Sequence, residues 1–185
     1  MIDIKKIDKT WTIFLDRDGV INIEKYEDYI YNYGEFKFYE GAREAIKIFA
    51  EKFGIIVIAT NQRGVERGLM TEKDLQDIHI KMQEEIKKNG GRIDKVYYNT
   101  SLSNDDPGRK PNPGMAFEAK KDFPFIDFSK SIMVGNNISD MEFGRNAGMH
   151  TVFLKTTNPN QGVPYPAIDM AFDSLYDFAK ALELS

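Results

Sequence analysis

The sequence predicts an α/β fold with a mostly parallel central sheet, in a Rossmann-like three-layer arrangement. One observation is that short apolar runs alternate along the chain with longer amphipathic segments. Another is that these runs are rich in β-branched and aromatic residues and are continuously apolar, which is typical of strands buried on both faces. Strands that alternate with helices in this way favour a parallel sheet with helices on both sides.

Five segments have the composition of buried strands, and a sixth is placed near residues 168–172. The first begins at Trp11 and ends with Asp16, directly before a sequence with turn residues. The others follow at intervals that leave room for a helix between most of them. The five predicted strands are residues 11–16, 55–60, 95–99, 131–135 and 151–154.

Helices are predicted between the strands and at the C-terminal end. In the first, apolar residues from Ala42 to Ala50 recur at helical spacing on one face. The second opens with Thr71 as a cap and closes with lysines followed by Asn89 and Gly90. The third is expected to carry a proline in its first turn. The five predicted helices are residues 41–53, 71–91, 111–123, 139–148 and 174–184.

Length and composition limit the possible classes of protein. We expect residues 1–185 to form a single domain, with residues 1–10 as a short N-terminal extension. A net charge of −4 gives no electrostatic reason to expect nucleic acid as a partner. Without cysteine the chain has neither disulfides nor thiolate metal sites. It shows no signal peptide and no apolar run near the ~20 residues that span a bilayer. A cytoplasmic monomer without a membrane partner is therefore expected.

Polar residues stand where three of the predicted strands end. Asp16 ends the first strand and Thr60 the second, and the segment NNISD follows Gly135 at the end of the fourth. Ligands of open parallel sheets bind beyond the carboxyl ends of the strands. We therefore expect a catalytic site at this edge.

The segment FLDRDG places two carboxylates two residues apart behind a buried strand. Asp16, at the rigid strand end, suits a nucleophile that attacks phosphorus to give an acyl-phosphate. Asp18, in the turn, suits an acid that protonates the leaving oxygen and later deprotonates water. Gly19 lets the backbone turn with a positive φ.

A site with two carboxylates repels phosphate, so cations are needed beside it. Hard oxygen ligands indicate Mg²⁺. Arg109 and Lys110 supply further positive charge in a loop that enters a helix, and the Thr60 hydroxyl with nearby backbone N–H groups can hold phosphoryl oxygens.

Four motifs in order carry a resemblance that covers nearly the whole chain: DRDG at 16–19, ATNQ at 59–62, RKPNPG at 109–114 and GNNISD at 135–140. The chain resembles the haloacid dehalogenase superfamily of aspartate-nucleophile phosphatases. More narrowly, it is similar to the D,D-heptose 1,7-bisphosphate phosphatases and their histidinol-phosphatase relatives.

The resemblance implies a role for each motif residue. Asp16 is the nucleophile, Asp18 the general acid and base, and Thr60 with Lys110 stabilises the phosphoryl group. The residues expected to contact substrate or its phosphate are Asn61, Gln62, Arg63, Arg109, Glu24 and Asn137.

The expected cofactor is Mg²⁺, held by the Asp16 carboxylate, the Asp18 backbone carbonyl and the Asn136 side-chain oxygen. Asp140 completes the metal site from a second layer, where it positions Lys110 or a bound water. An asparagine stands at position 136 where the family carries an acid. Asn136 has an alternative interpretation as an ordinary turn residue. As a neutral ligand, it predicts weak Mg²⁺ binding without substrate and tighter binding in Asn136→Asp.

The chain departs from the family pattern at other points. Relatives usually carry cysteines and a histidine that bind zinc before RKP, whereas residues 99–108 contain neither, so no structural zinc is expected. Arg63 replaces a small residue and Asn137 a common basic one. The segments between the motifs leave no room for a cap domain, so an open, capless site is predicted. The aromatic and acidic residues 24–41 are expected to form a flap that shapes specificity.

The favoured function is a Mg²⁺-dependent phosphomonoesterase acting on a small phosphorylated metabolite, with D-glycero-D-manno-heptose 1,7-bisphosphate 7-phosphatase as the best single assignment. Histidinol phosphate or another sugar phosphate is the alternative substrate. Alternatives of another class are a receiver-type phosphoacceptor domain and a phosphate-binding protein that has lost catalysis. The base at Asp18 argues against the former, because it hydrolyses an acyl-phosphate quickly. Retention of the other motif residues argues against the latter.

Overall fold

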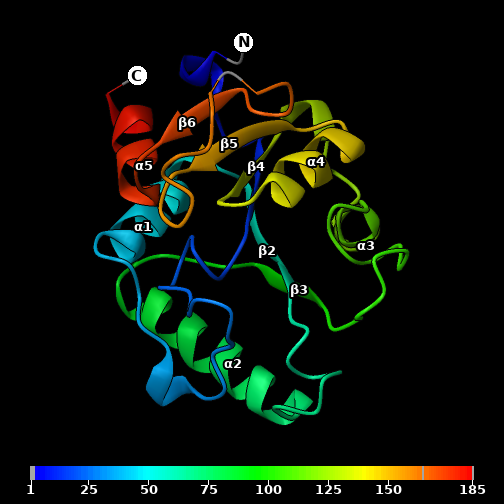
Figure 1. Cartoon of the computed structure of the whole chain (residues 1–185). Coiled ribbons are helices and arrows are strands. Elements are labelled where there is room, and N and C mark those ends of the chain that lie inside the picture. Colours follow the sequence, from blue (N-terminus) through cyan, green and yellow to red (C-terminus); the bar gives the residue numbers. More distant parts are fainter. Residues whose placement is uncertain (1–2, 164, 185) are drawn as a thin grey trace.

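A six-stranded sheet runs through the centre of the computed structural model, which describes residues 3–163 and 165–184 (Figure 1). The strand order is β3-β2-β1-β4-β5-β6, and every neighbouring pair is parallel. The sheet consists of β1 (Thr12–Leu15), β2 (Ile55–Asn61), β3 (Lys95–Asn99), β4 (Ser131–Gly135), β5 (His150–Leu154) and β6 (Met170–Phe172).

The position of β1 between β2 and β4 explains why the motifs meet. In the register of the sheet, Leu15 at the end of β1 pairs with Ile58 in β2 and with Val134 in β4. The residues that follow these three strands therefore emerge side by side. This is the point where the strand order reverses, which is where ligands bind in such sheets.

In the described residues, five α-helices and three short 3₁₀ helices accompany the strands. The α-helices are α1 (Ala42–Lys52), α2 (Glu72–Lys88), α3 (Gly114–Asp122), α4 (Ile138–Ala147) and α5 (Leu175–Glu183). The 3₁₀ helices are η1 (Ile4–Lys6), η2 (Tyr33–Glu35) and η3 (Phe128–Lys130).

The helices form a layer on each face of the sheet because successive strand residues point to opposite sides. Ile13 and Leu15 of β1 belong to the apolar cluster that includes residues of α1, α2 and α5. Phe14, between them, belongs to a second cluster with residues of α3 and α4. The predicted α/β three-layer fold with a parallel sheet is confirmed.

Most of the predicted elements lie within a few residues of the observed ones. The Thr71 cap of α2 is present: its hydroxyl accepts from the Asp74 N–H at 3.1 Å, and the Asp74 carboxylate accepts from the Thr71 N–H at 2.8 Å. The start of α3 was predicted wrongly. This helix begins at Gly114, and Pro113 is the capping residue before it rather than part of its first turn.

The segments between the first three motifs hold few elements. Residues 19–59 contain η2 and α1 before β2, and residues 62–109 contain α2 and β3. No additional folded unit is inserted in either of these fully described segments. The flap, residues 24–41, lies beside α2 (Figure 1), where η2 and α2 are in contact.

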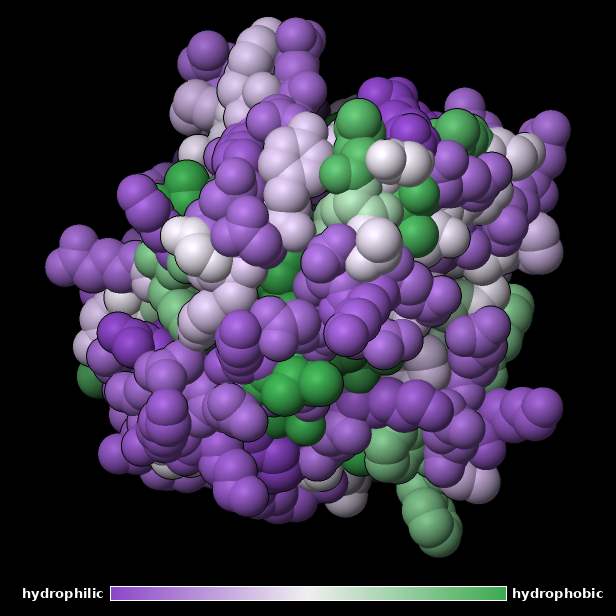
Figure 2. All heavy atoms as spheres, turned by 90° about the horizontal axis from the view of Figure 1, so that it is seen from below, coloured by the Kyte–Doolittle hydropathy of each residue, from purple (hydrophilic) through white to green (hydrophobic). Residues whose placement is uncertain are grey.

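The flap is only partly available to a ligand. Its Ile30 and Phe36 side chains are buried in the same apolar cluster as α1 and α2, whereas Tyr26 is exposed. Seen from below, the surface of the molecule is mainly hydrophilic, with apolar side chains in small areas between polar and charged ones (Figure 2). In the part of the chain that is described, no helix has the length and apolar character to cross a bilayer.

The Phe14 side chain is a test of how the sheet is anchored to α3 and α4. It is fully buried and meets the Phe143 ring of α4 edge to face, with 6.4 Å between ring centroids. We expect Phe14→Ala to lower the free energy of unfolding by about 3–5 kcal/mol, because a cavity opens at the centre of this layer. Phe125→Ala, at a side chain that is 93% exposed, should change it by less than about 0.5 kcal/mol. Urea unfolding followed by circular dichroism measures both, and a similar loss in the two variants would contradict the assigned packing.

Candidate active site

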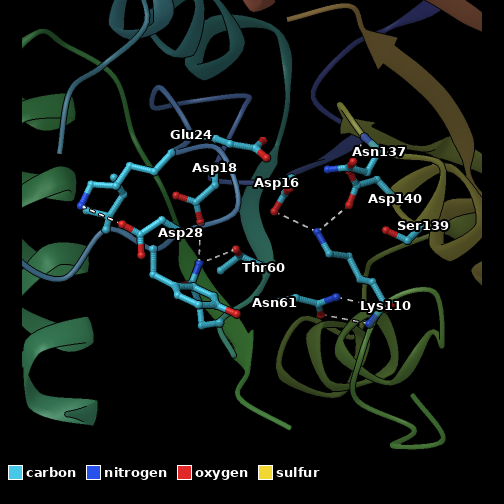
Figure 3. Close-up of a pocket in the computed structure, with 14 residues that line it drawn as sticks. Asp16, Asp18, Glu24, Asp28, Thr60, Asn61, Lys110, Asn137, Ser139 and Asp140 are labelled. Atoms are coloured by element: carbon cyan, nitrogen blue, oxygen red, sulfur yellow. Dashed lines mark hydrogen bonds and ion pairs between the residues drawn. The ribbon is translucent and has the colours of Figure 1, made fainter. Parts of the chain in front are cut away.

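A buried lysine joins three of the four motifs. The Lys110 ammonium lies 2.9 Å from the Asp16 carboxylate and 2.7 Å from the Asp140 carboxylate, and it donates to the Ala59 carbonyl at 2.7 Å (Figure 3). All three charged side chains are at least nine-tenths buried. One cation thus holds the ends of β1 and β2 and the first turn of α4 in a fixed relation.

The protonation of this cluster follows from burial and from the three charges. Burial raises the pKa of Asp16 to about 7; the Lys110 ammonium opposes this shift, while the Asp140 and Asp18 carboxylates add to it. Burial acts to lower the pKa of Lys110, but Asp140 and Asp16 together hold it above its ordinary value. Lys110 therefore stays charged, and its ammonium favours the carboxylate form of Asp16 that nucleophilic attack requires.

Asp140 is engaged at both oxygens. One contacts Lys110, and the other accepts from the backbone N–H groups of Asn136 and Asn137 at 3.1 and 3.0 Å. The close approach requires a glycine at position 135, because a Cβ there would lie 2.2 Å from the Asp140 Cβ. Asp140 was predicted in the metal site from a second layer, and it lies where it orients Lys110 and the loop after β4.

Asp18 lies in a set of hydrogen bonds that hold its carboxylate as the anion. Arg17 donates to both oxygens at 3.0 and 3.1 Å, Asn22 donates at 2.9 Å and Gln62 at 2.8 Å. Burial acts to raise the pKa of Asp18, but Arg17, Asn22 and Gln62 lower it below its ordinary value. The Asp18 side chain, which the sequence placed in the turn beyond the first strand, is thus fixed by protein groups.

Arg17 and His79, for which no functional role was predicted, hold Asp18 in place: Arg17 donates to Asp18 and also contacts His79. Arg17 is completely buried, and one terminal nitrogen lies 3.1 Å from His79 Nε2. Since guanidinium only donates, His79 Nε2 is the acceptor and the ring is neutral. The sequence signal for this pair was weak, because an arginine between two aspartates and a histidine on a helix are each common in other roles.

The polar side chains of the ATNQ motif line the cleft, but their hydrogen bonds are made with other residues of the site. The Thr60 hydroxyl is buried and accepts from Gln62 Nε2 at 2.9 Å. Asn61 makes two hydrogen bonds of 3.1 Å with the Lys110 backbone, one to its carbonyl and one from its N–H. Asn61 and Gln62 were predicted to contact substrate; both line the cleft, but their polar atoms are directed at Lys110 and Asp18.

Asn136 is fully buried, and its amide has a defined orientation. Its Nδ2 donates to Glu24 Oε2 at 2.8 Å and to the Thr157 hydroxyl at 2.6 Å, whereas its Oδ1 has no hydrogen-bond partner. Exchange of the two amide atoms would place Oδ1 against a carboxylate, so the assignment is chemically required. Gly19 has φ +82° and makes room for this contact, because a Cβ would lie 2.0 Å from Asn136 Nδ2 and 2.6 Å from Glu24 Oε2.

The cleft at the strand ends has a volume of about 650 Å³ including its open mouth. Its lining is acidic, which disfavours an anionic substrate unless a cation is present. Glu24 shows the crowding of charge: burial raises its pKa and the hydrogen bond from Asn136 opposes the shift, while the Asp18 and Asp140 charges add to it. Five carboxylates line the cleft against two ammonium groups: Asp16, Asp18, Glu24, Asp28 and Asp140 against Lys25 and Lys110.

The donors present fit a hard cation such as Mg²⁺. The buried Asn136 Oδ1 accepts no hydrogen bond and can therefore serve as an oxygen ligand for the metal. The Asp16 carboxylate lies at the neighbouring strand end. In the described residues, no three His, Cys, Asp or Glu side chains are grouped to hold a metal ion.

Residues 99–108, where relatives of the family usually hold zinc, are organised by hydrogen bonds. The Asp106 carboxylate accepts from Asn99 at 3.1 Å and from the Gly108 N–H at 2.7 Å. Arg63 and Arg109 both donate to Asn104 Oδ1, at 2.7 and 3.4 Å. The Arg63 and Arg109 guanidinium groups therefore lie close together against Asn104 of this loop.

The remaining predicted residue, Asn137, lines the cleft and is the N-cap residue of α4, where its backbone N–H donates to the Asp140 carboxylate at 3.0 Å. The cleft is also lined by residues that the sequence analysis did not single out: Ser139 from the first turn of α4, and Lys25, Asp28, Tyr29 and Ile30 from the flap. Ser139 lies within the GNNISD motif, whereas no motif marks the four flap residues, which reach the cleft through the path of the flap.

Comparisons with known proteins identify the family of the chain. A family model described as HAD-hydrolase-like matches residues 108–177. The D-glycero-alpha-D-manno-heptose-1,7-bisphosphate 7-phosphatase of Campylobacter jejuni is 39% identical over 154 residues, which are 83% of this chain and 87% of that protein. The chain belongs to this family of HAD phosphatases. It is a phosphoric monoester hydrolase, which excludes the receiver-type and non-catalytic alternatives.

Other relatives are less similar in sequence but match nearly the whole chain. The D-glycero-beta-D-manno-heptose-1,7-bisphosphate 7-phosphatase of Yersinia pestis is 31% identical and is matched over 92% of this chain and 94% of its own length. The crystal structure of D,D-heptose 1,7-bisphosphate phosphatase from B. bronchiseptica contains magnesium and phosphate. It has a TM-score of 0.85 at 27% identity, covering 94% of this chain and 98% of its own. Magnesium is thus the metal of this type of site.

The buried His79 makes the stability of this phosphatase depend on pH. Burial, together with the Arg17 charge, lowers the pKa of His79 to about 3, against 6.5 for an ordinary histidine. The neutral ring stabilises the fold fully above pH 6.5, and this contribution is lost as the pH falls toward 3, because the unfolded chain then binds the extra proton. At about 1.4 kcal/mol per pH unit, the free energy of unfolding falls by about 2 kcal/mol more in wild type than in His79→Gln between pH 6.5 and 5. Chemical unfolding at several pH values measures this difference, and equal slopes for the two proteins would contradict a neutral, buried His79.

Proposed function

We propose that the chain hydrolyses the 7-phosphate of D-glycero-D-manno-heptose 1,7-bisphosphate through an aspartyl-phosphate on Asp16. The observation that supports the chemistry is the buried contact between Asp16 and Lys110 at the end of β1, beside a second carboxylate at position 18. The family relatives support the substrate, since they are named for both anomers of this bisphosphate.

In the first step, an Asp16 carboxylate oxygen forms a bond to phosphorus while the ester P–O bond breaks. The leaving oxygen takes a proton from Asp18, and Lys110 and Thr60 stabilise the phosphoryl oxygens. In the second step, Asp18 removes a proton from water as that water attacks the acyl-phosphate. Inorganic phosphate leaves, and the Asp16 carboxylate is restored.

The surroundings of Asp18 set its protonation before each step. In the free enzyme, Arg17, Asn22 and Gln62 hold it as the anion, which is the form that activates water. A phosphate dianion in the cleft adds negative charge beside it and raises its pKa, because like charges disfavour ionisation. Substrate binding thus favours the protonated form that the first step uses.

Asp16, Asp18 and Asn136 would hold Mg²⁺. When bound, the metal neutralises phosphate charge and brings it to the acidic cleft. The chain's own residues orient the reaction around this site: Lys110 fixes the Asp16 carboxylate, and the Asn61 side chain fixes the Lys110 backbone.

The second phosphate of the substrate has a candidate binding region at the Arg63–Arg109 pair. Burial and the nearby Arg63 charge lower the pKa of Arg109, while Tyr29 acts in the opposite direction. Tyr29 lines the cleft and also packs against Gly64, so the two guanidinium groups lie near its flap side. Two adjacent cations suit a distal phosphate better than the single phosphate of histidinol phosphate.

The nucleophile assignment predicts a specific loss of activity. Asp16→Asn should abolish steady-state phosphate release from heptose 1,7-bisphosphate, because an amide cannot form the acyl-phosphate. The fold should survive, since the amide retains the shape of the side chain. A phosphate-release assay with circular dichroism as the control for folding checks both, and turnover near the wild-type rate would refute a covalent role for Asp16.

The proposed distal phosphate site predicts a selective effect. Arg63→Ala and Arg109→Ala should each lower kcat/KM for heptose 1,7-bisphosphate by about 10–100-fold, the usual cost of losing a charged hydrogen bond. For heptose 7-phosphate, which lacks the distal phosphate, the loss should be much smaller. Arg43→Ala, at a half-exposed arginine paired with Glu85, is the matched control. Equal losses for both substrates would remove the arginine pair from distal phosphate recognition.

The same assay distinguishes the candidate substrates. Both anomers of heptose 1,7-bisphosphate and histidinol phosphate are compared with Mg²⁺ present. We expect faster hydrolysis of the bisphosphates, with the alpha anomer preferred because the relatives of 39 and 34% identity are named for it.

A further inference from the structure

Asn136, directly after β4, contributes no charge to the proposed metal site. The side chain is a neutral amide, it is fully buried, and its oxygen has no hydrogen-bond partner. The acid nearest to it in sequence, Asp140, has both oxygens engaged by Lys110 and by backbone N–H groups. The loop after β4 therefore offers the cation an oxygen atom but no free charge.

A carboxylate from the opposite side of the cleft contacts this amide. Glu24 Oε2 accepts from Asn136 Nδ2 at 2.8 Å, and Figure 3 shows the Glu24 side chain extended from the flap toward the side of Asn137 and Asp140. The Thr157 hydroxyl holds the other side of Nδ2 at 2.6 Å. These two acceptors direct Oδ1 away from themselves, so the donor atom for the cation is fixed by Glu24.

We propose that Glu24 supplies the negative charge that Asn136 lacks, acting through the Asn136 amide on the Mg²⁺ held at the strand ends. Glu24 is thus a positioning residue for the metal ligand and not only a substrate contact. The inference rests on the proposed Mg²⁺ site, and it is independent of which phosphorylated sugar is the substrate.

The packing around Gly19 supports a built arrangement. A Cβ at this position would overlap with both the Asn136 amide and the Glu24 carboxylate. The turn of the first motif therefore leaves space for two side chains that come from β4 and from the flap. A carboxylate at this distance from an amide also polarises it, which increases the partial negative charge on Oδ1.

The test uses the substrate-free protein, so that Mg²⁺ affinity is measured without turnover. Glu24→Gln removes the charge and keeps an oxygen that can accept from Asn136 Nδ2. We expect the dissociation constant for Mg²⁺, measured by calorimetry in phosphate-free buffer, to rise about tenfold, as is typical when a group behind a metal ligand is changed. Glu40→Gln makes the same change of charge at an exposed glutamate outside this cleft and should leave the constant unchanged.

An exchange of the two side chains gives the decisive comparison. In the double variant Glu24→Gln/Asn136→Asp, the carboxylate moves to position 136, and the amide at position 24 can donate to it. The net charge of the site is restored, and so is the hydrogen bond with its direction reversed. Mg²⁺ affinity should return to the wild-type value or exceed it. A double variant as weak as Glu24→Gln would overturn the proposal.

The variant Asn136→Asp alone tests the contact itself. Without metal it places two carboxylates against each other, so the melting temperature should fall; Glu24→Gln in the same chain, or added Mg²⁺, should restore it. With metal, this variant should bind Mg²⁺ more tightly than wild type. Equal Mg²⁺ affinity for wild type and Glu24→Gln would overturn the proposal. If the affinities change as expected but no turnover of heptose 1,7-bisphosphate is observed, the result bears only on the proposed substrate.

Discussion

The ion pairs of Lys110 with Asp16 and Asp140 are the interaction on which the arrangement of the site depends. Each partner belongs to a different part of the fold: the end of β1, the loop before α3 and the first turn of α4. A buried ammonium without partners would be strongly unfavourable, so burial makes the two carboxylates necessary and fixes their spacing. The same contacts stabilise the assembled strand ends and, in the proposed mechanism, prepare the Asp16 carboxylate for attack.

Beside these ion pairs, the two residues that follow β1 lie on different sides of the site and have different roles. Asp16 continues β1 into the cleft, while the following Arg17 is buried behind it and bonds to Asp18, Gln62 and His79. Asp18, the proposed catalytic acid, is therefore held by Arg17, which is completely buried, and by Gln62, which lines the cleft. This explains how a turn residue acquires the rigidity that proton transfer requires. In the flap, the buried Phe36 side chain anchors the segment, and Glu24, Lys25, Asp28 and Tyr29 line the cleft.

The sequence was sufficient for the fold and for the motif residues because both follow from local patterns. Continuous apolar runs marked the strands, and the ends of parallel strands gather at one edge, which located Asp16, Thr60 and Asn136. Long-range contacts left no such pattern. The Arg17–His79 pair joins residues 62 positions apart, and the Glu24–Asn136 contact joins residues 112 positions apart. Neither spacing nor composition records which side chain receives a given hydrogen bond, so the partners of Asn61 and Gln62 were also not predictable.

The distribution of charge in the cleft explains why a neutral side chain at position 136 is favourable. Of the carboxylates that line the cleft, Asp140 and Asp16 share the Lys110 charge, and Asp18 is paired with Arg17. A further carboxylate at position 136 would face the half-buried Glu24 within hydrogen-bonding distance, where two anions repel. With Glu24 in place, a neutral amide at 136 removes this repulsion in the metal-free enzyme while keeping an oxygen ligand. Asn136 then supplies the ligand atom and Glu24 the negative charge, which lies behind the ligand instead of on it.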